Sequence, residues 1–357
     1  MTHTAVYLYP WDVDGDPGTA SRIADLGVPE VSLAAVYHDV RAITPFHPAH
    51  RIVTRPAGAY YNPDPRRWHD GVIRPALVSP GSFERAAGAL RDAGLTVTAW
   101  AVVAHSESLG ATYPDAVVRN AFGDPYPWAL CCATPELRKY AATLAAEIAS
   151  LDCADAIELE ACGWFGFDHL SAHDKTGVRG PGLLDVCFCP SCEKAFDEAG
   201  IDAIRARAAV RSAIDGDGEL PAELESAVHR ARGERSGEFL REVMSAARSA
   251  ADKPVLVQTH PDRRQCGANP GHDPAVLELA DGVSLNGPAD LLTRMPNGFG
   301  RRALTVQAVS GLTDRAADLA GEATAALAAG ATEVRFYHAG LASREDLAAL
   351  ATVVRSL

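Results

Sequence analysis

Short apolar segments rich in β-branched residues alternate along the chain with longer segments of helical periodicity. Apolar runs bounded by turn residues predict buried strands, and apolar residues repeating every three to four positions predict amphipathic helices. Eight strands are expected, at residues 5–9, 30–36, 96–104, 155–161, 254–259, 282–286, 304–309 and 332–338. Helical segments are expected at 19–26, 83–93, 135–151, across 192–251, and at 274–280, 290–294, 315–328 and 344–356.

Eight strands alternating with helical segments predict an α/β fold of the (β/α)₈ type, a TIM barrel. A doubly wound open sheet is the alternative, but no GxGxxG sequence follows the first strand. We expect a single TIM-barrel domain over residues 1–357 with long insertions after the second and fourth strands, at about 40–80 and 162–251. Long connections in a compact domain usually cover or build a site.

The composition is that of a soluble globular enzyme, with 47% hydrophobic and 22% charged residues. The 46 acidic residues exceed the 33 Lys and Arg residues, for a net charge of −13. The field of such a chain repels nucleic acid and anionic membranes, so the expected partner is a small neutral or cationic molecule. A homo-oligomer is left open.

The sequence predicts a cytoplasmic protein. No stretch of 18 uninterrupted apolar residues is present, so no membrane span is expected. The first residues lack the basic start and the long apolar stretch of a signal peptide. In the cytoplasm thiols stay reduced, and the eight cysteines are therefore interpreted as core residues, metal ligands or reactive thiols.

Polar residues gather where the predicted strands end. Active sites of TIM barrels lie at the C-terminal ends of the strands. Nearly every strand supplies a group there that can hydrogen-bond a polyol or an amine, which favours a binding site over a merely solvated rim. The expected ligand-binding residues are His38, His105, Trp164, His260, Asn286, Gln307, Arg335 and Tyr337.

Alternation along the fourth strand places Glu158 and Glu160 in the barrel interior, with Glu160 nearer the C-terminal end. Two carboxylates in one apolar interior do not both ionise cheaply, so one is expected to titrate high or to be paired. A buried structural pair of Glu158 with Arg335 is the alternative to a catalytic role for Glu158. Glu160, beside apolar Trp164, is the stronger candidate for a general acid.

Cys187, Cys189 and Cys192 form a CxCxxC sequence in the second insertion. Thiols this close in a reduced compartment predict a soft metal, zinc (Zn²⁺) first, and the alternative is a redox or incidental cluster. His173 is the expected fourth ligand, and His169, Cys162 and Cys266 are the alternatives. A closed shell of four protein ligands would make the zinc structural, and three ligands with a water would make it catalytic. The structural role is favoured, because three thiolates weaken the Lewis acidity of the metal.

Cys131 and Cys132 lie just before the helix expected at 135–151. Adjacent cysteines rarely bond to each other, and a thiol before a helix N-terminus can have a lowered pKa. We interpret both as buried loop thiols.

The order of these features resembles that of glycoside-hydrolase-like TIM barrels that carry a CxCPxC segment after strand four. The resemblance rests on IELE at 157–160, GWFGFDH at 163–169, CFCPSC at 187–192 with the helix that follows, and NAFGD at 120–124. It is close over residues 120–192 and rests on strand order elsewhere. It implies a barrel that acts on a carbohydrate, with Glu160 as the acid/base residue.

The seventh strand departs from the pattern of retaining enzymes, in which a second Glu at its end is the nucleophile. Here no acidic residue follows until Asp314. Ordinary glycoside hydrolysis requires two carboxylates, and the partner would come from Asp12, Asp39, Glu107 or Glu158. We expect hydrolysis of a small carbohydrate or glycoside, with Glu160 as general acid and Asp39 or Glu158 as its partner. Inverting hydrolysis and a non-hydrolytic reaction stay open.

Two further hypotheses belong to other classes. The first is a metal-dependent isomerase, lyase or amidase, in which the histidines at the strand ends bind a catalytic metal beside Glu160. Loss of activity on chelation would mark it. The second is a sugar-binding barrel without catalysis, suggested by the missing acid of strand seven. Saturable glycan binding without product would mark that one.

Overall fold

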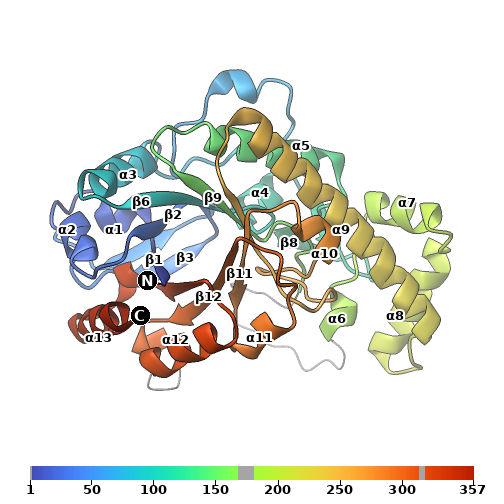
Figure 1. The fold of residues 1–357 in the computed structure, drawn as a ribbon. Coiled ribbons are helices and arrows are strands. Elements are labelled where there is room, and N and C mark those ends of the chain that lie inside the picture. The colour runs from blue at the N-terminus through green and yellow to red at the C-terminus, as the bar shows by residue number, and fades with distance from the viewer. Residues whose placement is uncertain (1, 168–180, 313–317) are drawn as a thin grey trace.

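The computed structural model describes residues 2–167, 181–312 and 318–357 (Figure 1). The expectations for His169, His173 and Asp314 fall outside these ranges. No helix among the described residues combines the length and the apolar character that crossing a membrane requires.

Eight parallel strands close into a barrel, as predicted. Each pairs in parallel with the next, and β1 also pairs with β2, which closes the sheet. The strands in order are β1 (His3–Leu8), β2 (Glu30–Tyr37), β6 (Thr96–Val102), β9 (Ala156–Glu160), β10 (Val255–Gln258), β11 (Gly282–Asn286), β12 (Arg301–Gln307) and β13 (Glu333–Tyr337). All are largely buried, which explains why they stand out in the sequence as apolar runs.

Helices surround the barrel (Figure 1). The connections contain α1 (Pro10–Val13), α2 (Thr19–Ala24), α3 (Ser82–Asp92), α5 (Pro135–Ala149), α9 (Ala222–Ala250), α10 (Pro274–Leu277), α11 (Asp290–Thr293), α12 (Leu319–Ala328) and α13 (Arg344–Ser356). Helix α5 starts with Pro135 after an extended Thr134, as a helix with proline in its first turn should.

Three connections carry additional structure. The segment after β2 contains a hairpin of β3 (Val40–Ile43) and β4 (Ile52–Arg55), then β5 (Gly58–Ala59) and η1 (Pro65–Arg67). The segment after β6 contains α4 (Glu107–Thr112) and a hairpin of β7 (Val117–Arg119) and β8 (Pro125–Leu130). The segment after β9 contains α6 (Pro181–Leu184), α7 (Pro190–Glu198) and α8 (Ala203–Asp215) before α9.

Neither hairpin was predicted from the sequence, and the connection after β6 is longer than expected. The strands of the first hairpin are short and partly exposed, so they form no apolar run. Strand β8 contains Pro125 and Pro127, and prolines normally argue against a strand.

The described residues form two hydrophobic cores. The larger one fills the barrel and the space beneath its helices. The smaller one lies under α7, α8 and the N-terminal part of α9, and includes Ala121, Phe188, Phe196, Ala206, Val210 and Val228. Helix α9 belongs to both, because its C-terminal part packs on α5 and contributes Phe239 and Val243 to the larger core. That residues 1–357 form a single domain stays a prediction.

Candidate functional site

A cavity of about 890 Å³ opens at the C-terminal ends of the barrel strands. Every strand contributes to its wall, which is the arrangement of an active site in this fold. The polar lining residues are Tyr7, Tyr37, His38, Glu160, Gln258, His260, Gln265, Asn269, Asn286, Thr305, Gln307 and Tyr337, and Trp100 adds an indole. Within the described ranges, Glu160 is the one carboxylate in this wall.

Glu160 is a buried acid that faces the cavity. It ends β9, and its side chain is only slightly exposed. The indole Nε1 of Trp100 on β6 donates a hydrogen bond to Oε2 at 2.7 Å. Burial raises the pKa of Glu160 from its usual value of 4.5 to about 8, and the charge of Glu158 adds to the shift. At neutral pH the carboxyl group is therefore protonated, as a proton donor must be.

The backbone fixes Glu160 where the strand ends. Ala161 has a positive φ of 51°, which is uncommon for a residue with a Cβ atom. The carbonyl of Glu160 accepts a hydrogen bond from the amide of Val103, and the amide of Ala161 donates to the carbonyl of Ala268. The turn is thus tied to β6 on one side and to the segment after β10 on the other.

Glu158 lies one layer deeper and is fully buried. Its carboxylate accepts hydrogen bonds from Tyr7 Oη at 2.7 Å, from Gln258 Nε2 at 3.1 Å and from the Ser32 hydroxyl. Arg335 Nη1 is 2.5 Å from Glu158 Oε2. The structure thus contains the buried pair considered from sequence, and Glu158 does not line the cavity.

Arg335 is fully buried below the cavity, inside a cluster of ion pairs. Besides Glu158 it contacts Glu30 at 2.8 Å and Glu333 at 2.6 Å, and Arg301 bridges these same two carboxylates. Although burial alone would raise it, the pKa of Glu30 is held well below its usual range by the His3 hydrogen bond and by both guanidinium groups. Arg335 therefore forms ion pairs with buried carboxylates and does not line the cavity, where it was expected to bind the ligand.

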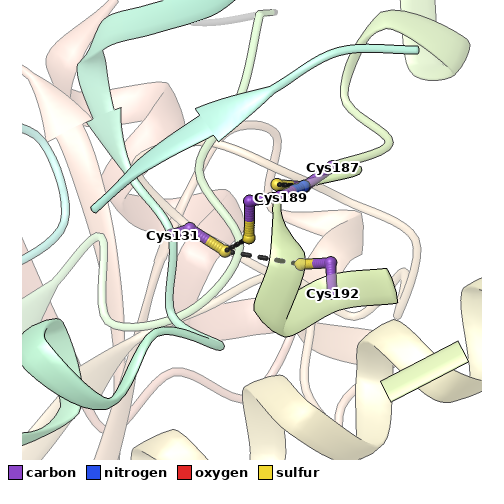
Figure 2. Close-up of side chains that lie close together, drawn as sticks. All are labelled: Cys131, Cys187, Cys189 and Cys192. Carbon is purple, nitrogen blue, oxygen red and sulfur yellow. Dashed lines mark hydrogen bonds between the residues drawn. The ribbon is translucent and has the colours of Figure 1, made fainter. Parts of the chain in front are cut away.

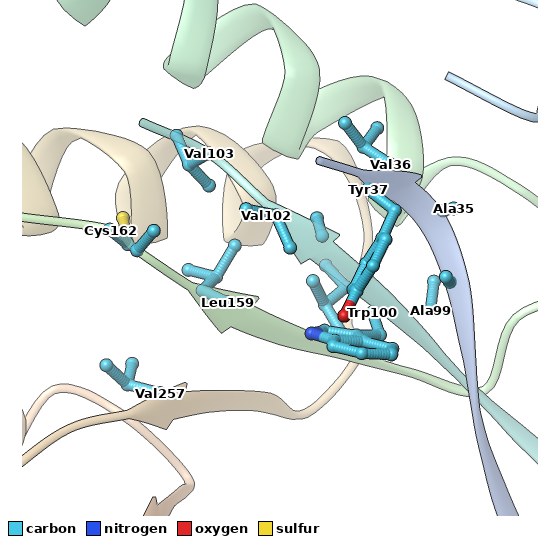
Figure 3. Packing of buried hydrophobic residues seen from close by; sticks show 14 of the residues in the cluster. Ala35, Val36, Tyr37, Ala99, Trp100, Val102, Val103, Leu159, Cys162 and Val257 are labelled. Carbon is cyan, nitrogen blue, oxygen red and sulfur yellow. The ribbon is translucent and has the colours of Figure 1, made fainter. Parts of the chain in front are cut away.

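Three tyrosine hydroxyls meet beside the cavity. Tyr9 Oη lies 3.0 Å from Tyr37 Oη and 2.9 Å from Tyr337 Oη, and the last two are 3.2 Å apart. Burial raises the pKa of all three, so they stay neutral. Tyr37 also packs edge-on against Trp100, with ring centroids 4.7 Å apart (Figure 3). The wall near Glu160 is therefore aromatic and uncharged.

Side-chain amides make up much of the remaining wall. Gln258, Gln265, Asn269, Asn286 and Gln307 all line it. Oδ1 of Asn269 and Oε1 of Gln307 are buried and find no hydrogen-bond partner in the described part of the chain. Buried acceptors without partners are costly, so a ligand rich in hydroxyl groups would satisfy them.

The structure places most of the sequence-predicted ligand-binding residues in the wall: His38, His260, Asn286, Gln307 and Tyr337. His105 and Trp164 lie behind it. The imidazole of His105 stacks on His38 and on Phe165, with ring centroids 4.4 Å apart in each case. Trp164 packs under the guanidinium of Arg232 at 4.5 Å.

Asp39 directly follows His38 but is not part of the wall. Burial raises its pKa, and the nearby charge of Glu107 adds to the effect. Its Oδ2 has no hydrogen-bond partner among the residues described. Asp12 is a second buried acid, whose pKa burial raises to about 7, but it lies outside the main cavity next to His338.

Several lining residues were not selected from the sequence as ligand-binding residues. Tyr7 lies within an apolar strand and had no signal of its own. Gln265 and Asn269 lie in the segment after β10, which has no hydrophobic periodicity. Their position in the sequence could have identified them, since polar residues that follow a barrel strand lie at its C-terminal end.

Four cysteines form a second candidate site (Figure 2). Cys131 follows β8, and the other three, Cys187, Cys189 and Cys192, flank the start of α7. Their sulfurs lie within 4.8 Å of one another, and all four side chains are buried. Sγ of Cys131 is 3.4 Å from that of Cys192 and 3.7 Å from that of Cys189. We call these four residues the cysteine cluster.

The cysteine cluster fits a tetrahedral thiophilic ion. Sulfurs about 2.3 Å from a zinc ion lie about 3.8 Å apart, close to the observed separations. The amides of Arg119 and Cys189 donate to Sγ of Cys187 at 3.4 Å, as they would to a thiolate. The hydrogen bonds with Cys187 and Cys189 raise the pKa of Cys131, whereas the hydrogen bond with Cys131 lowers the pKa of Cys189. A bound cation would favour the ionised form of all four.

Cys131 and Cys132 are buried in the loop after β8, as expected from the sequence. The sequence did not predict that Cys131 belongs to the cysteine cluster, whereas Cys132 stays outside it. Cys266 lines the main cavity instead, and the expected ligand His173 lies outside the described residues. Nothing in the sequence around Cys131 signals its partners, because the β7–β8 hairpin brings them together.

No family model and no curated protein sequence matches the chain. Solved structures share its fold. The glycoside hydrolase domain of PgaB (BpsB) from Bordetella bronchiseptica has a TM-score of 0.65 at 16% identity, with 99% of each chain covered. The catalytic domain of a β-amylase from Paenibacillus polymyxa has a TM-score of 0.63 at 12% identity, covering 99% of this chain and 98% of that one.

α-L-Fucosidase isoenzyme 2 from Paenibacillus thiaminolyticus has a TM-score of 0.61 at 15% identity. All of this chain is covered but only 49% of the fucosidase, so the chain spans about half the length of that protein. At these identities the likeness concerns the fold alone. The chain therefore shares the barrel fold of these solved structures.

Proposed function

We propose that the protein is a glycosidase-like hydrolase that acts on a small carbohydrate or glycoside, with Glu160 as general acid. One observation carries the proposal. Glu160 is a carboxyl group that stays protonated up to a pH of about 8, and it faces a polar cavity at the C-terminal end of the barrel. The solved structures that share this fold include a glycoside hydrolase domain and the catalytic domain of a β-amylase, which supports the proposal.

In the proposed reaction, Glu160 gives its proton to the leaving oxygen as the bond from that oxygen to the sugar carbon breaks. The hydrogen bond from Trp100 occupies Oε2, which leaves Oε1 to carry the proton. A water molecule supplies the new hydroxyl group, and its proton passes to a base. Neither Asp39 nor Glu158 lines the cavity, so the proton would reach either of them through water. Asp39 suits the role of base better, because Oδ2 of Asp39 has no partner among the described residues, whereas the oxygens of Glu158 are engaged by Arg335 and by hydroxyl and amide donors.

The neutral wall supports an uncharged sugar as substrate. Tyrosine hydroxyls and side-chain amides offer donors and acceptors to sugar hydroxyl groups, and the unpartnered oxygens of Asn269 and Gln307 call for donors from the ligand.

A screen of methyl and aryl glycosides tests the proposal. Turnover of one of them should be lost in Glu160→Gln, while the melting temperature shows that the variant is folded. Glu219→Gln, at an exposed position, is the control. Full activity in Glu160→Gln would contradict the assignment.

A sugar-binding protein without catalysis is the second candidate, favoured by the single carboxylate in the described part of the wall. Saturable binding without any product would establish it. The metal-dependent hypothesis has no comparable support. The ligand groups found among the described residues are the cysteine cluster and His3 with Glu30 and Glu333, and neither includes a histidine of the cavity.

We propose that the cysteine cluster binds one zinc ion in a closed shell of four thiolates, with a structural role. Four protein ligands leave no position for water, and none of the four lines the cavity. The ion would join the end of β8 to the start of α7.

A further inference from the structure

A smaller cavity of about 300 Å³ adjoins the main one. The two share Gln265 and Cys266 as part of their walls. The far side of the smaller cavity is formed by α6 and by three residues of α9, Glu225, His229 and Arg232. Its volume is at the lower end of the roughly 300–1,000 Å³ typical of ligand pockets.

The partition between the two cavities is held in place by backbone hydrogen bonds. The amide of Gln265 donates to the carbonyl of Asp262, the amide of Gly271 to the carbonyl of Gln265, and the amide of Gly267 to the carbonyl of Trp164. The segment is therefore tied both to itself and to the turn after β9. A ligand that occupies both cavities would therefore contact a segment whose backbone is already fixed by hydrogen bonds.

Arg232 places a buried guanidinium group in the wall of the smaller cavity. It is buried, with 4% of its surface exposed, and its guanidinium lies over the ring of Trp164. Nη2 donates to the carbonyl of Asp185 at 3.1 Å, while Nε has no hydrogen-bond partner in the described ranges. A buried N–H group without a partner is costly, and a ligand oxygen would satisfy it.

The charges around this cavity are mixed. Arg264 Nη1 pairs with Glu225 Oε1 at 3.1 Å, and Asp262 adds a carboxylate. Burial, with the nearby charge of Arg232, lowers the pKa of His229 to about 4, so it is neutral. A charged substituent would meet a group of its own sign at close range, whereas a sugar hydroxyl both donates and accepts.

We propose that the smaller cavity is a subsite for a second, uncharged sugar unit of the same substrate, so that the substrate contains at least two units. The main cavity holds the unit next to Glu160, and the chain continues past Gln265 and Cys266 toward Arg232. The proposal rests on the proposed function and specifies its substrate class.

Binding to Glu160→Gln tests the subsite separately from turnover. The probes are methyl glycosides with one, two and three units of glucose, galactose or N-acetylglucosamine, measured by titration calorimetry. For the sugar that binds, the Kd should fall at least tenfold from one unit to two and change little from two to three. An equal Kd for one and two units would overturn the proposal.

A cavity-filling variant localises the effect. His229→Trp, made in the Glu160→Gln background, should bring the ratio of the one-unit to the two-unit Kd close to one. His69→Trp, at an exposed position that does not line either cavity, should leave the ratio of the two Kd values unchanged and serves as the matched control. A ratio that His229→Trp leaves unchanged would also contradict the subsite.

Arg232→Lys gives a second variant that keeps the charge but loses the unpartnered Nε. Its expected effect is a weaker binding of the two-unit glycoside alone. If Glu160→Gln binds none of the glycosides and the unaltered protein cleaves none of them, the proposed function itself is contradicted. Cleavage or binding without a gain from the second unit contradicts the subsite only.

Discussion

The indole Nε1 of Trp100 lies 2.7 Å from Oε2 of Glu160 and joins neighbouring strands of the barrel through their side chains. The two influences on this carboxyl group oppose each other. Burial favours the neutral acid, and the indole hydrogen bond favours the carboxylate. The balance leaves Glu160 with a pKa of about 8.

The first prediction concerns the pH dependence of catalysis. A general acid must be protonated, so kcat/KM should fall as the pH rises through about 8. Trp100→Phe removes the hydrogen bond that favours the carboxylate, and the upper limb should move to higher pH by about one unit. The measurement is kcat/KM between pH 5 and 10. If the fall of kcat/KM at high pH occurs at the same pH in Trp100→Phe, a group other than Glu160 is responsible for it.

The second prediction concerns stability. Glu160 keeps its proton in the folded chain up to about pH 8 but ionises near 4.5 when the chain unfolds. The unfolded state therefore binds fewer protons between these values, and the free energy of unfolding falls as the pH rises. Glu160→Gln does not have this ionisation penalty and should be the more stable protein at pH 8, by about 4 kcal/mol.

Urea denaturation at pH 4.5 and pH 8 measures this difference. The two proteins should be nearly equal in stability at the lower pH and diverge at the higher one. A constant difference between them at both values would show that packing, not ionisation, is responsible.

The third prediction separates the two candidate partner carboxylates. Asp39→Asn should lower kcat at least a hundredfold with little change in the free energy of unfolding. Glu158→Gln should instead cost about 3 kcal/mol or more of stability, because it leaves buried Arg335 short of one carboxylate. Kinetics and denaturation on both variants decide the matter, and the reverse pattern would assign catalysis to Glu158.

The fourth prediction concerns the cysteine cluster. Elemental analysis should find one zinc per chain, and X-ray absorption should find a shell of sulfur alone. Cys131→Ser should weaken zinc retention and lower the melting temperature by several degrees. Cys153→Ser, outside the cluster, should change neither. Nitrogen ligands in the absorption spectrum, or full zinc retention in Cys131→Ser, would refute the four-thiolate shell.

The sequence was most informative for helices and strands in which hydrophobic residues repeat regularly along the whole element. Alternation in β9 placed Glu160 toward the open end and Glu158 beneath it, and the structure has that arrangement. Eight buried strands each left an apolar run, and the barrel followed from their count and order.

Prediction failed where contacts depend on the path of an irregular segment. Cys131 and Cys192 are 61 residues apart and meet only because a hairpin that the apolar pattern did not reveal turns the chain back. Asn269 and Gln265 reach the cavity from a segment without periodicity. Arg335 illustrates a different difficulty. Its inward direction was clear, but its depth was set by Glu30 and Glu158 on two other strands and by Glu333 on its own strand.

Helix α9 has 29 residues and is therefore roughly 43 Å long. One part of it is packed on α5 over the barrel, while its N-terminal part covers the smaller core and forms a wall of the smaller cavity. A substitution in the smaller core, at Phe196 for example, is therefore expected to shift the N-terminal part of α9 and to change the width of the smaller cavity without altering a barrel strand. Under the proposed function, the packing of α7 and α8 is thus a means of changing substrate preference that leaves the barrel and Glu160 as they are.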